Sequence, residues 1–141
     1  MKIKLFKILS LFMFIMITGC ATTSQQIMET EESQVKIRAM QTRVFDTNDK
    51  NLMMRNTIST LQDLEFVIEN ADLTFGTVTA KKYIHNSAVE ATATVKEKGE
   101  NQITVRLNAR YGIKIVEDPE IYQDFFTALS KSIFLAANEI D

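Results

Sequence analysis

The sequence predicts an α+β domain in which an antiparallel sheet carries two helices on one face. Two observations lead to this fold class. Apolar and polar residues alternate along residues 89–95 and again along 103–109, which is typical of strands with one buried face. Residues 49–65 and 118–137 repeat apolar residues at steps of three and four, which indicates amphipathic helices. The expected order is strand, helix, four strands and helix.

A short strand and a capped helix are the first expected elements. Residues 41–46 hold a brief apolar pair, Val44 and Phe45, and turn-forming residues follow. Asn48 or Asp49 is expected to cap a helix that ends near residue 65. The apolar stripe on this helix comprises Met54, Ile58, Leu61 and Leu64. The side chains expected to face away from the core are Arg55, Asn56, Gln62 and Asp63.

The segment after this helix is expected to contain a short buried strand at residues 66–68 and a turn at residues 70–72. The apolar residues then lie at odd-numbered positions as far as Phe75 and at even-numbered positions from Val78 onwards. A β-bulge at Gly76 would keep the apolar side chains on one face, and we expect it there.

A turn at residues 98–101 is expected to join the two alternating strands into an antiparallel hairpin. Asp118 is the expected cap of the last helix, with Pro119 at the first helical position, where its missing N–H costs nothing. The apolar stripe of this helix comprises Tyr122, Phe125, Phe126, Leu129, Ile133, Phe134 and Ala137. We interpret this stripe as a core face rather than a ligand pocket.

The first twenty residues have the layout of a secretory signal. Three lysines precede an apolar run at residues 8–17, which is too short for a spanning helix of about 20 residues. The run closes on Ile-Thr-Gly-Cys, which resembles the lipobox of bacterial lipoproteins. The resemblance implies cleavage before Cys20 and acylation of its thiol; an uncleaved anchor with a free Cys20 is the alternative. Ala21 at the next position implies export to the outer membrane, facing the periplasm, if the host is Gram-negative.

The predicted organisation is a signal peptide over residues 1–19, a lipidated N-terminus and flexible tether over 20–39, and one α+β domain over 40–141. The tether is rich in Thr, Ser, Gln and Glu, so it cannot bury enough apolar surface to offset the entropy of ordering. A helix over residues 25–40 is the alternative, because its last residues form a weak apolar stripe.

The charge of the mature chain argues for attachment through lipid alone. The signal peptide contains three of the 16 basic residues and none of the 18 acidic ones, so cleavage leaves a net charge of −5. An acidic domain is not attracted to anionic head groups or to phosphates. We therefore expect a membrane partner through the lipid, and no nucleic acid partner.

Residue types that carry catalysis or hold metals are sparse. His85 is the only histidine, and we expect it to be solvated in a loop. There is no zinc-binding cluster of Cys and His, and four glycines leave no phosphate-binding loop. We therefore expect neither an enzyme nor a metal or cofactor site. The weakest alternative is a carboxylate-based cell-wall hydrolase, with Asp46, Asp63 and Asp72 as the acids to examine.

One surface remains as a candidate binding face. If both helices cover the apolar side of the sheet, the polar strand positions form an open side that could bind a partner, a glycan or another strand. These positions are Thr77, Thr79, Lys81, Thr92, Thr94, Thr104, Arg106, Asn108 and Arg110. A solvated face of good strand formers is the alternative.

The order of elements resembles the TBP-like and helix-grip folds. Residues 60–68, 71–72 and 76–80 also look like a pattern of small bacterial lipoproteins of unassigned function, and more distantly like the helix-grip domains of the BamC lipoproteins in the outer-membrane assembly complex. These residues mostly determine fold, so the resemblance implies architecture and compartment, and no catalytic residue.

The function that we expect is a non-enzymatic accessory or scaffold in a membrane-associated assembly, with an envelope protein as partner. The main alternative is a small-ligand domain that binds lipid or glycan between the sheet and the Phe-rich helix. That alternative requires a closed apolar cavity of at least ~300 Å³.

Overall fold

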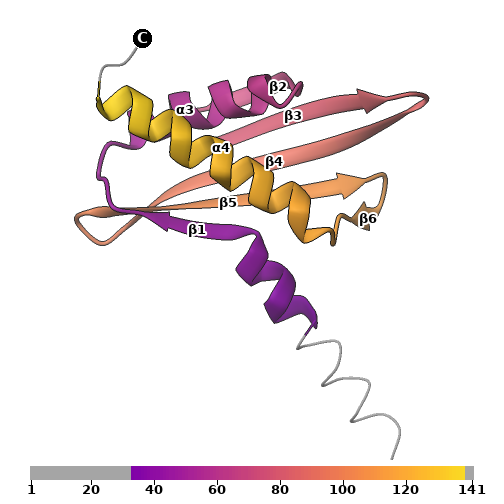
Figure 1. Ribbon diagram of the computed structural model, residues 1–141, viewed down its shortest axis with the longest axis horizontal. Helices are drawn as coiled ribbons and strands as arrows, with labels where there is room; N and C mark the ends of the chain where they lie inside the picture. The colour runs from indigo at the N-terminus through magenta and orange to yellow at the C-terminus, as the bar shows by residue number, and fades with distance from the viewer. Residues whose placement is uncertain (1–32, 139–141) are drawn as a thin grey trace, which may run out of the picture. The chain divides into compact units, whose positions relative to one another are not determined.

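The computed structural model describes residues 33–138; Cys20, the signal peptide and most of the predicted tether lie outside these residues. The described part is α+β, with a six-stranded antiparallel sheet and three helices (Figure 1). The predicted fold class is confirmed at this level. The predicted count of five strands and two helices was too low, because the structure also contains a two-residue strand and a helix over residues 33–40. The latter agrees with the alternative of a helix before residue 40.

The chain order alternates one helix with groups of strands. The elements are β1 (Thr42–Phe45), α3 (Lys50–Asp63), β2 (Val67–Asp72), β3 (Thr77–Ile84), β4 (Ser87–Lys98), β5 (Gln102–Tyr111), β6 (Lys114–Ile115) and α4 (Pro119–Ala137). The sheet order is β1-β5-β4-β3-β2, and β6 also pairs with β5. Among the described helices, none is long and apolar enough to cross a bilayer.

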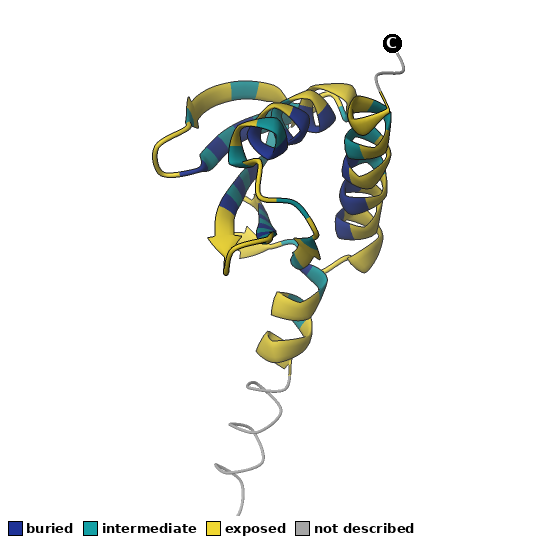
Figure 2. Ribbon diagram, turned by 90° about the vertical axis from the view of Figure 1, so that its left-hand side faces the viewer, coloured by how far each residue is buried: buried dark blue, intermediate teal, exposed yellow. Residues whose placement is uncertain are grey.

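The β4–β5 hairpin forms the centre of the core, as its alternating pattern predicts. Its register pairs Ala91 with Ala109 and Val95 with Val105, and the inward-facing residues from 91 to 95 and from 103 to 109 are at most 3% exposed. Helices α3 and α4 lie across this side of the sheet and contribute to the same core (Figures 1 and 2). Their fully buried apolar residues are Met53, Met54, Leu61, Tyr122, Phe125 and Leu129.

Both helix caps are those that the sequence predicts. Asp49 Oδ1 accepts a hydrogen bond from the Leu52 N–H at 2.8 Å, and Asp118 Oδ1 accepts one from the Glu120 N–H at 3.0 Å. The predicted stripe of α4 is buried only as far as Leu129, and Phe134 is exposed. The last two turns of α4 are therefore only partly buried, with Ile133 still packed against the core.

Asn56 was predicted to face away from the core, and this was wrong. Its side chain is buried, and its Oδ1 accepts a hydrogen bond from Ser132 Oγ at 3.1 Å. The physical reason is that α4 packs along the flank of α3, which widens the buried surface beyond a single stripe. The Asn56 Nδ2 group is left without a hydrogen-bond partner. Such a buried donor weakens the packing between the helices.

The predictions for residues 66–76 were wrong in three respects. Residues 70–72 belong to β2 and form no turn; the chain turns at residues 73–76, where Asp72 Oδ1 accepts a hydrogen bond from the Phe75 N–H at 2.9 Å. The bulge lies between Ile68 and Asn70, not at Gly76. β2 is mostly exposed, because an edge strand has a neighbour on one side only. The apolar residues of the turn, including Phe75, consequently point into solvent.

The close packing of Gly76 against β4 can be tested by comparison with Gly99. Both have a positive φ, +67° and +66°, but a Cβ at Gly76 would lie 2.2 Å from the Val95 carbonyl oxygen, whereas nothing lies within 4 Å at Gly99. We expect Gly99→Ala to lower the free energy of unfolding by about 1 kcal/mol through backbone strain alone. Gly76→Ala should lower it by about 2–4 kcal/mol, because overpacking adds to the strain. Urea unfolding monitored by circular dichroism measures the free energy of unfolding of both variants. Equal losses of this free energy would contradict the close contact between Gly76 and the Val95 carbonyl oxygen.

Candidate functional site

The structure brings the predicted binding-face residues together on the outer side of the sheet, opposite the core. The strand register builds two adjacent rows across the sheet. One row runs Thr42, Arg106, Thr94, Thr77 and Asp72. The other runs Asn108, Thr92, Thr79 and Asn70. We refer to this surface, completed by Lys81, Thr104 and Arg110, as the outer face.

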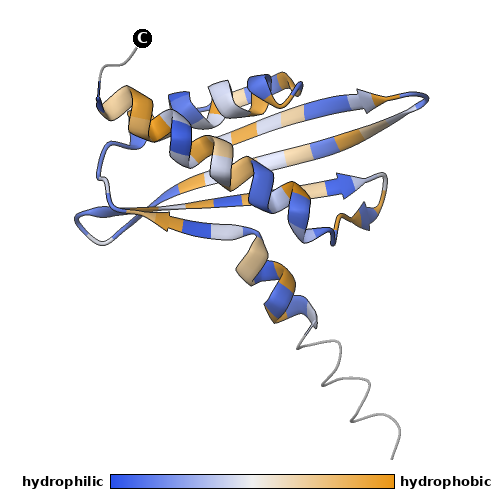
Figure 3. Cartoon of the chain, viewed as in Figure 1, coloured by the Kyte–Doolittle hydropathy of each residue, from blue (hydrophilic) through white to orange (hydrophobic). Residues whose placement is uncertain are grey.

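The outer face is polar and partly open to solvent in the described structure. Its threonines are half-buried by their neighbours on the sheet, while the alternate residues on the same strands are buried in the core. Figure 3 shows the resulting alternation of hydrophilic and hydrophobic residues along the central strands. Hydroxyl and amide groups therefore follow one another at about the strand spacing of ~4.8 Å.

A third row on the outer face consists of charged side chains. Lys81 Nζ lies 2.9 Å from Glu69 Oε1 and 3.6 Å from Glu90 Oε1. Arg110 contacts the other oxygen of Glu90, with Nη2 at 2.6 Å and Nε at 2.7 Å. The contacts link four residues whose charges alternate between negative and positive. The two cations therefore neutralise the two carboxylates.

These contacts also shift the ionisation of the row. The hydrogen bond from Arg110 lowers the pKa of Glu90 below its ordinary value. The hydrogen bond to Glu69 raises the pKa of Lys81. The outer face is consequently less basic than its Lys and Arg residues suggest. Sequence reasoning missed both acids, although the alternation along β4 places Glu90 on the same face as Thr92, and Glu69 lies on β2 at the register shift between Ile68 and Asn70.

Arg106 differs from the two paired cations. Within the described residues it makes no ion pair; its Nη2 donates to Gln41 Oε1 at 3.2 Å, and its buried Nε has no hydrogen-bond partner. Gln41 is itself buried and donates through Nε2 to Tyr122 Oη at 3.3 Å. The Tyr122 hydroxyl donates to the Val116 carbonyl at 2.5 Å. Arg106 is thus tied to the start of β1 and, through Gln41, to α4.

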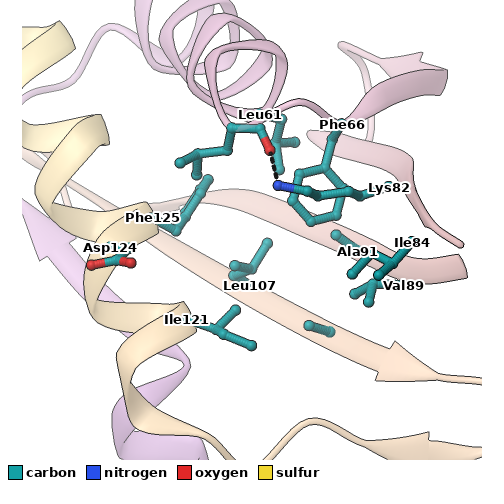
Figure 4. Close-up of a pocket in the computed structure, with 12 residues that line it drawn as sticks. Leu61, Phe66, Lys82, Ile84, Val89, Ala91, Leu107, Ile121, Asp124 and Phe125 are labelled. Carbon is teal, nitrogen blue, oxygen red and sulfur yellow. Dashed lines mark hydrogen bonds between the residues drawn. The ribbon is translucent and has the colours of Figure 1, made fainter.

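A pocket lies on the core side, between α3, α4 and the sheet (Figure 4). Its volume is about 210 Å³, and it opens to solvent. Apolar side chains such as Leu61, Leu107 and Phe125 line it, with Lys82 and Asp124 as the charged residues. Lys82 Nζ is engaged by the Leu64 carbonyl at 3.1 Å and by Glu65 Oε2 at 2.8 Å, and this pairing lowers the pKa of Glu65.

The acids considered for a hydrolase do not converge. Asp46 follows β1 and Asp72 ends β2, which are opposite edges of the sheet and about 19 Å apart at the spacing of strands. Asp63 ends α3 at the end of β2 remote from Asp72, because the start of α3 contacts Thr74 through Lys50. Glycosidase carboxylates lie about 5–9.5 Å apart. His85 is exposed in the β3–β4 turn, as expected.

No cluster of His, Cys, Asp and Glu suited to a metal ion occurs among residues 33–138. Comparison with models of known protein families finds no match, and comparison with curated proteins finds none either. The function must therefore be argued from the surfaces themselves.

The charged row has a testable pH dependence. Because the folded-state pKa of Glu90 is lowered from 4.5, its contribution to stability is present above pH 4.5 and is lost as the pH falls through the lowered value. We expect Glu90→Gln to lower the urea midpoint at pH 7, and this effect should become smaller as the pH falls below 4.5 and Glu90 becomes protonated. Glu97→Gln, on the same strand and without an ion pair in the described structure, is the control. Equal effects of the two substitutions at pH 7 would contradict the assignment.

Proposed function

We propose that the chain is a lipid-anchored, non-enzymatic accessory module of the bacterial cell envelope, attached through Cys20 to the outer membrane and facing the periplasm. Its outer face binds a partner protein in a membrane-associated assembly. The observation that carries the proposal is the two-sidedness of the sheet: α3 and α4 bury one side, and the other side presents ordered rows of Thr, Asn and Arg.

The geometry of the outer face supports binding to a folded surface. Cross-strand neighbours such as Thr79, Thr92 and Asn108 share one row, so their side chains lose little conformational freedom on contact. The charged row at one end is neutral as a unit, which favours a partner of mixed charge over a polyanion. Arg106 differs from Lys81 and Arg110 because it forms no ion pair among the described residues.

We also propose that the domain is a variant of the TBP-like or helix-grip arrangement. The order β1, α3, β2 to β5 and α4 supports this, with β6 inserted before the last helix. A resemblance of this kind bears on architecture and leaves the partner open.

Binding of a small apolar ligand is the second proposal, because the pocket of Figure 4 has an apolar lining. The pocket volume of 210 Å³ is below the ~300 Å³ that a closed lipid or glycan cavity requires, and the pocket opens to solvent. The pocket is therefore suited to a short acyl segment or a single side chain rather than an enclosed lipid or a glycan.

Lipid attachment is tested at Cys20 in the host. We expect the chain to incorporate radiolabelled palmitate and to fractionate with the outer membrane. Cys20→Ser should abolish the label, leave the signal peptide uncleaved and change the fractionation, since serine cannot form the thioether. Thr22→Ser, two residues further on, is the control. An unlabelled wild type, or a Cys20→Ser protein that is processed normally, would disprove the anchor.

Partner binding is tested on the outer face. A photo-crosslinking residue at Thr79 should yield one product of defined mass in intact envelopes, and the same residue at the exposed Gln123 of α4 should yield none. Thr92→Arg places a charge in the row beside Thr79 and should reduce the product at least about tenfold, as loss of ~1.4 kcal/mol would. Gln123→Arg is the matched control. Products from Gln123 alone, or insensitivity to Thr92→Arg, would exclude the outer face.

A further inference from the structure

Two turns at one end of the sheet carry exposed apolar side chains. Tyr83, 69% exposed, and Ile84 lead into the β3–β4 turn, while the β5–β6 turn contains Ile113, which is 99% exposed, beside Tyr111 at 50%. The register places Tyr111 opposite Val89 of β4, so both turns lie at the same end (Figure 1). At the opposite end the β4–β5 turn contains only polar residues and glycine, and the β2–β3 turn exposes two apolar side chains, Leu73 and Phe75.

The shape of this end does not suit a flat protein interface. Ile113 follows Gly112, whose φ of +59° gives a tight turn, and its side chain has no cover from any described residue. On the outer side the charged row of Lys81, Glu90 and Arg110 begins directly behind the turns. The apolar side chains therefore form separate projections, whereas a stable protein interface needs about 800 Å² of contiguous surface on each partner.

The residue types at this end are those that bilayer interfaces accept. An aliphatic tip can enter the acyl boundary, and tyrosine rings behind it favour the level of the head groups. The acidic residues Glu117, Asp118 and Glu120 follow β6, so this end carries no excess of positive charge that would select anionic lipids.

The point where the N-terminal segment joins the sheet is compatible with such a contact. Gln41 precedes β1 and is linked through Tyr122 to Val116, which directly follows β6. From Cys20 to residue 33 the chain can span at most about 45 Å when fully extended. A tether of this length permits the β5–β6 turn to reach the bilayer surface.

We propose that the β3–β4 and β5–β6 turns insert Ile113 and the flanking tyrosines into the surface of a zwitterionic phospholipid bilayer. The inference rests on the proposed lipid anchor and adds a second contact to it. Two contacts fix the orientation of the domain, so that the outer face stands at a defined angle to the membrane instead of rotating about the tether.

The test uses the purified, lipidated protein reconstituted into phosphatidylcholine vesicles. Flotation of the protein with the vesicles is measured first; failure to float would disprove the anchor and is separate from the insertion itself. An environment-sensitive fluorophore is then attached to Lys114→Cys, and to Glu100→Cys in the β4–β5 turn as the matched control. Nitroxides on the lipid acyl chains should quench the probe at position 114 at least about twofold more than the probe at 100.

A second substitution separates insertion from mere proximity. Adding Ile113→Asn to the Lys114→Cys protein should reduce quenching to the level at position 100; at 99% exposure this change leaves the folded core untouched. Replacing a third of the phosphatidylcholine by phosphatidylglycerol should not increase the quenching, since insertion is apolar. Equal quenching at 114 and 100 in floated vesicles, or quenching that survives Ile113→Asn, would overturn the proposal. Shielding of position 114 only by an added envelope protein would also overturn it in favour of a protein contact.

Discussion

The register between β4 and β5 is the constraint on which the rest of the structure depends. It places the apolar residues of both strands on one side, where α3 and α4 can bury them, and lines up the polar residues on the other. Because side chains alternate with a period of two, a slip of one residue would move the core residues of the shifted strand to the solvent side. The same slip would separate Glu90 from Arg110 and so break the charged row. Core and outer face are therefore two results of one pairing.

Because the helices close one side of the sheet, the described residues offer three surfaces on which the proposals rest: the outer face, the end formed by the β3–β4 and β5–β6 turns, and the pocket between the helices. Each has a different chemistry. The outer face offers hydrogen-bonding groups in rows with balanced charge, the turns offer isolated apolar projections, and the pocket offers a small apolar recess. If the proposed lipid anchor and the proposed insertion of the turns both hold, the first two act together, since the contact made by the turns would set the orientation of the outer face.

Much of the fold was predictable because it depends on local physics. Asp49 and Asp118 cap their helices through hydrogen bonds to residues two or three positions away, and the alternation on β4 and β5 needs no partner to be recognised. The outer face followed from the same alternation. By contrast, the burial of Asn56 depends on α4, which lies about 76 positions further along the chain. The contact of Glu69 with Lys81 depends on the pairing of β2 with β3, which the pattern of either strand alone does not specify.

By itself, therefore, the sequence determined the α+β class, the helix starts, the central hairpin, the polar side of the sheet and the prediction of a lipid site at Cys20. Only the tertiary structure decided that the basic residues of the outer face are largely neutralised, that Arg106 is tied to Gln41, and that the exposed Tyr83, Tyr111 and Ile113 lie at the same end of the sheet. The physical reason is the range of the interactions. Periodicity and capping act within a few residues, whereas ion pairs across strands and the alignment of turns require the whole sheet to be assembled.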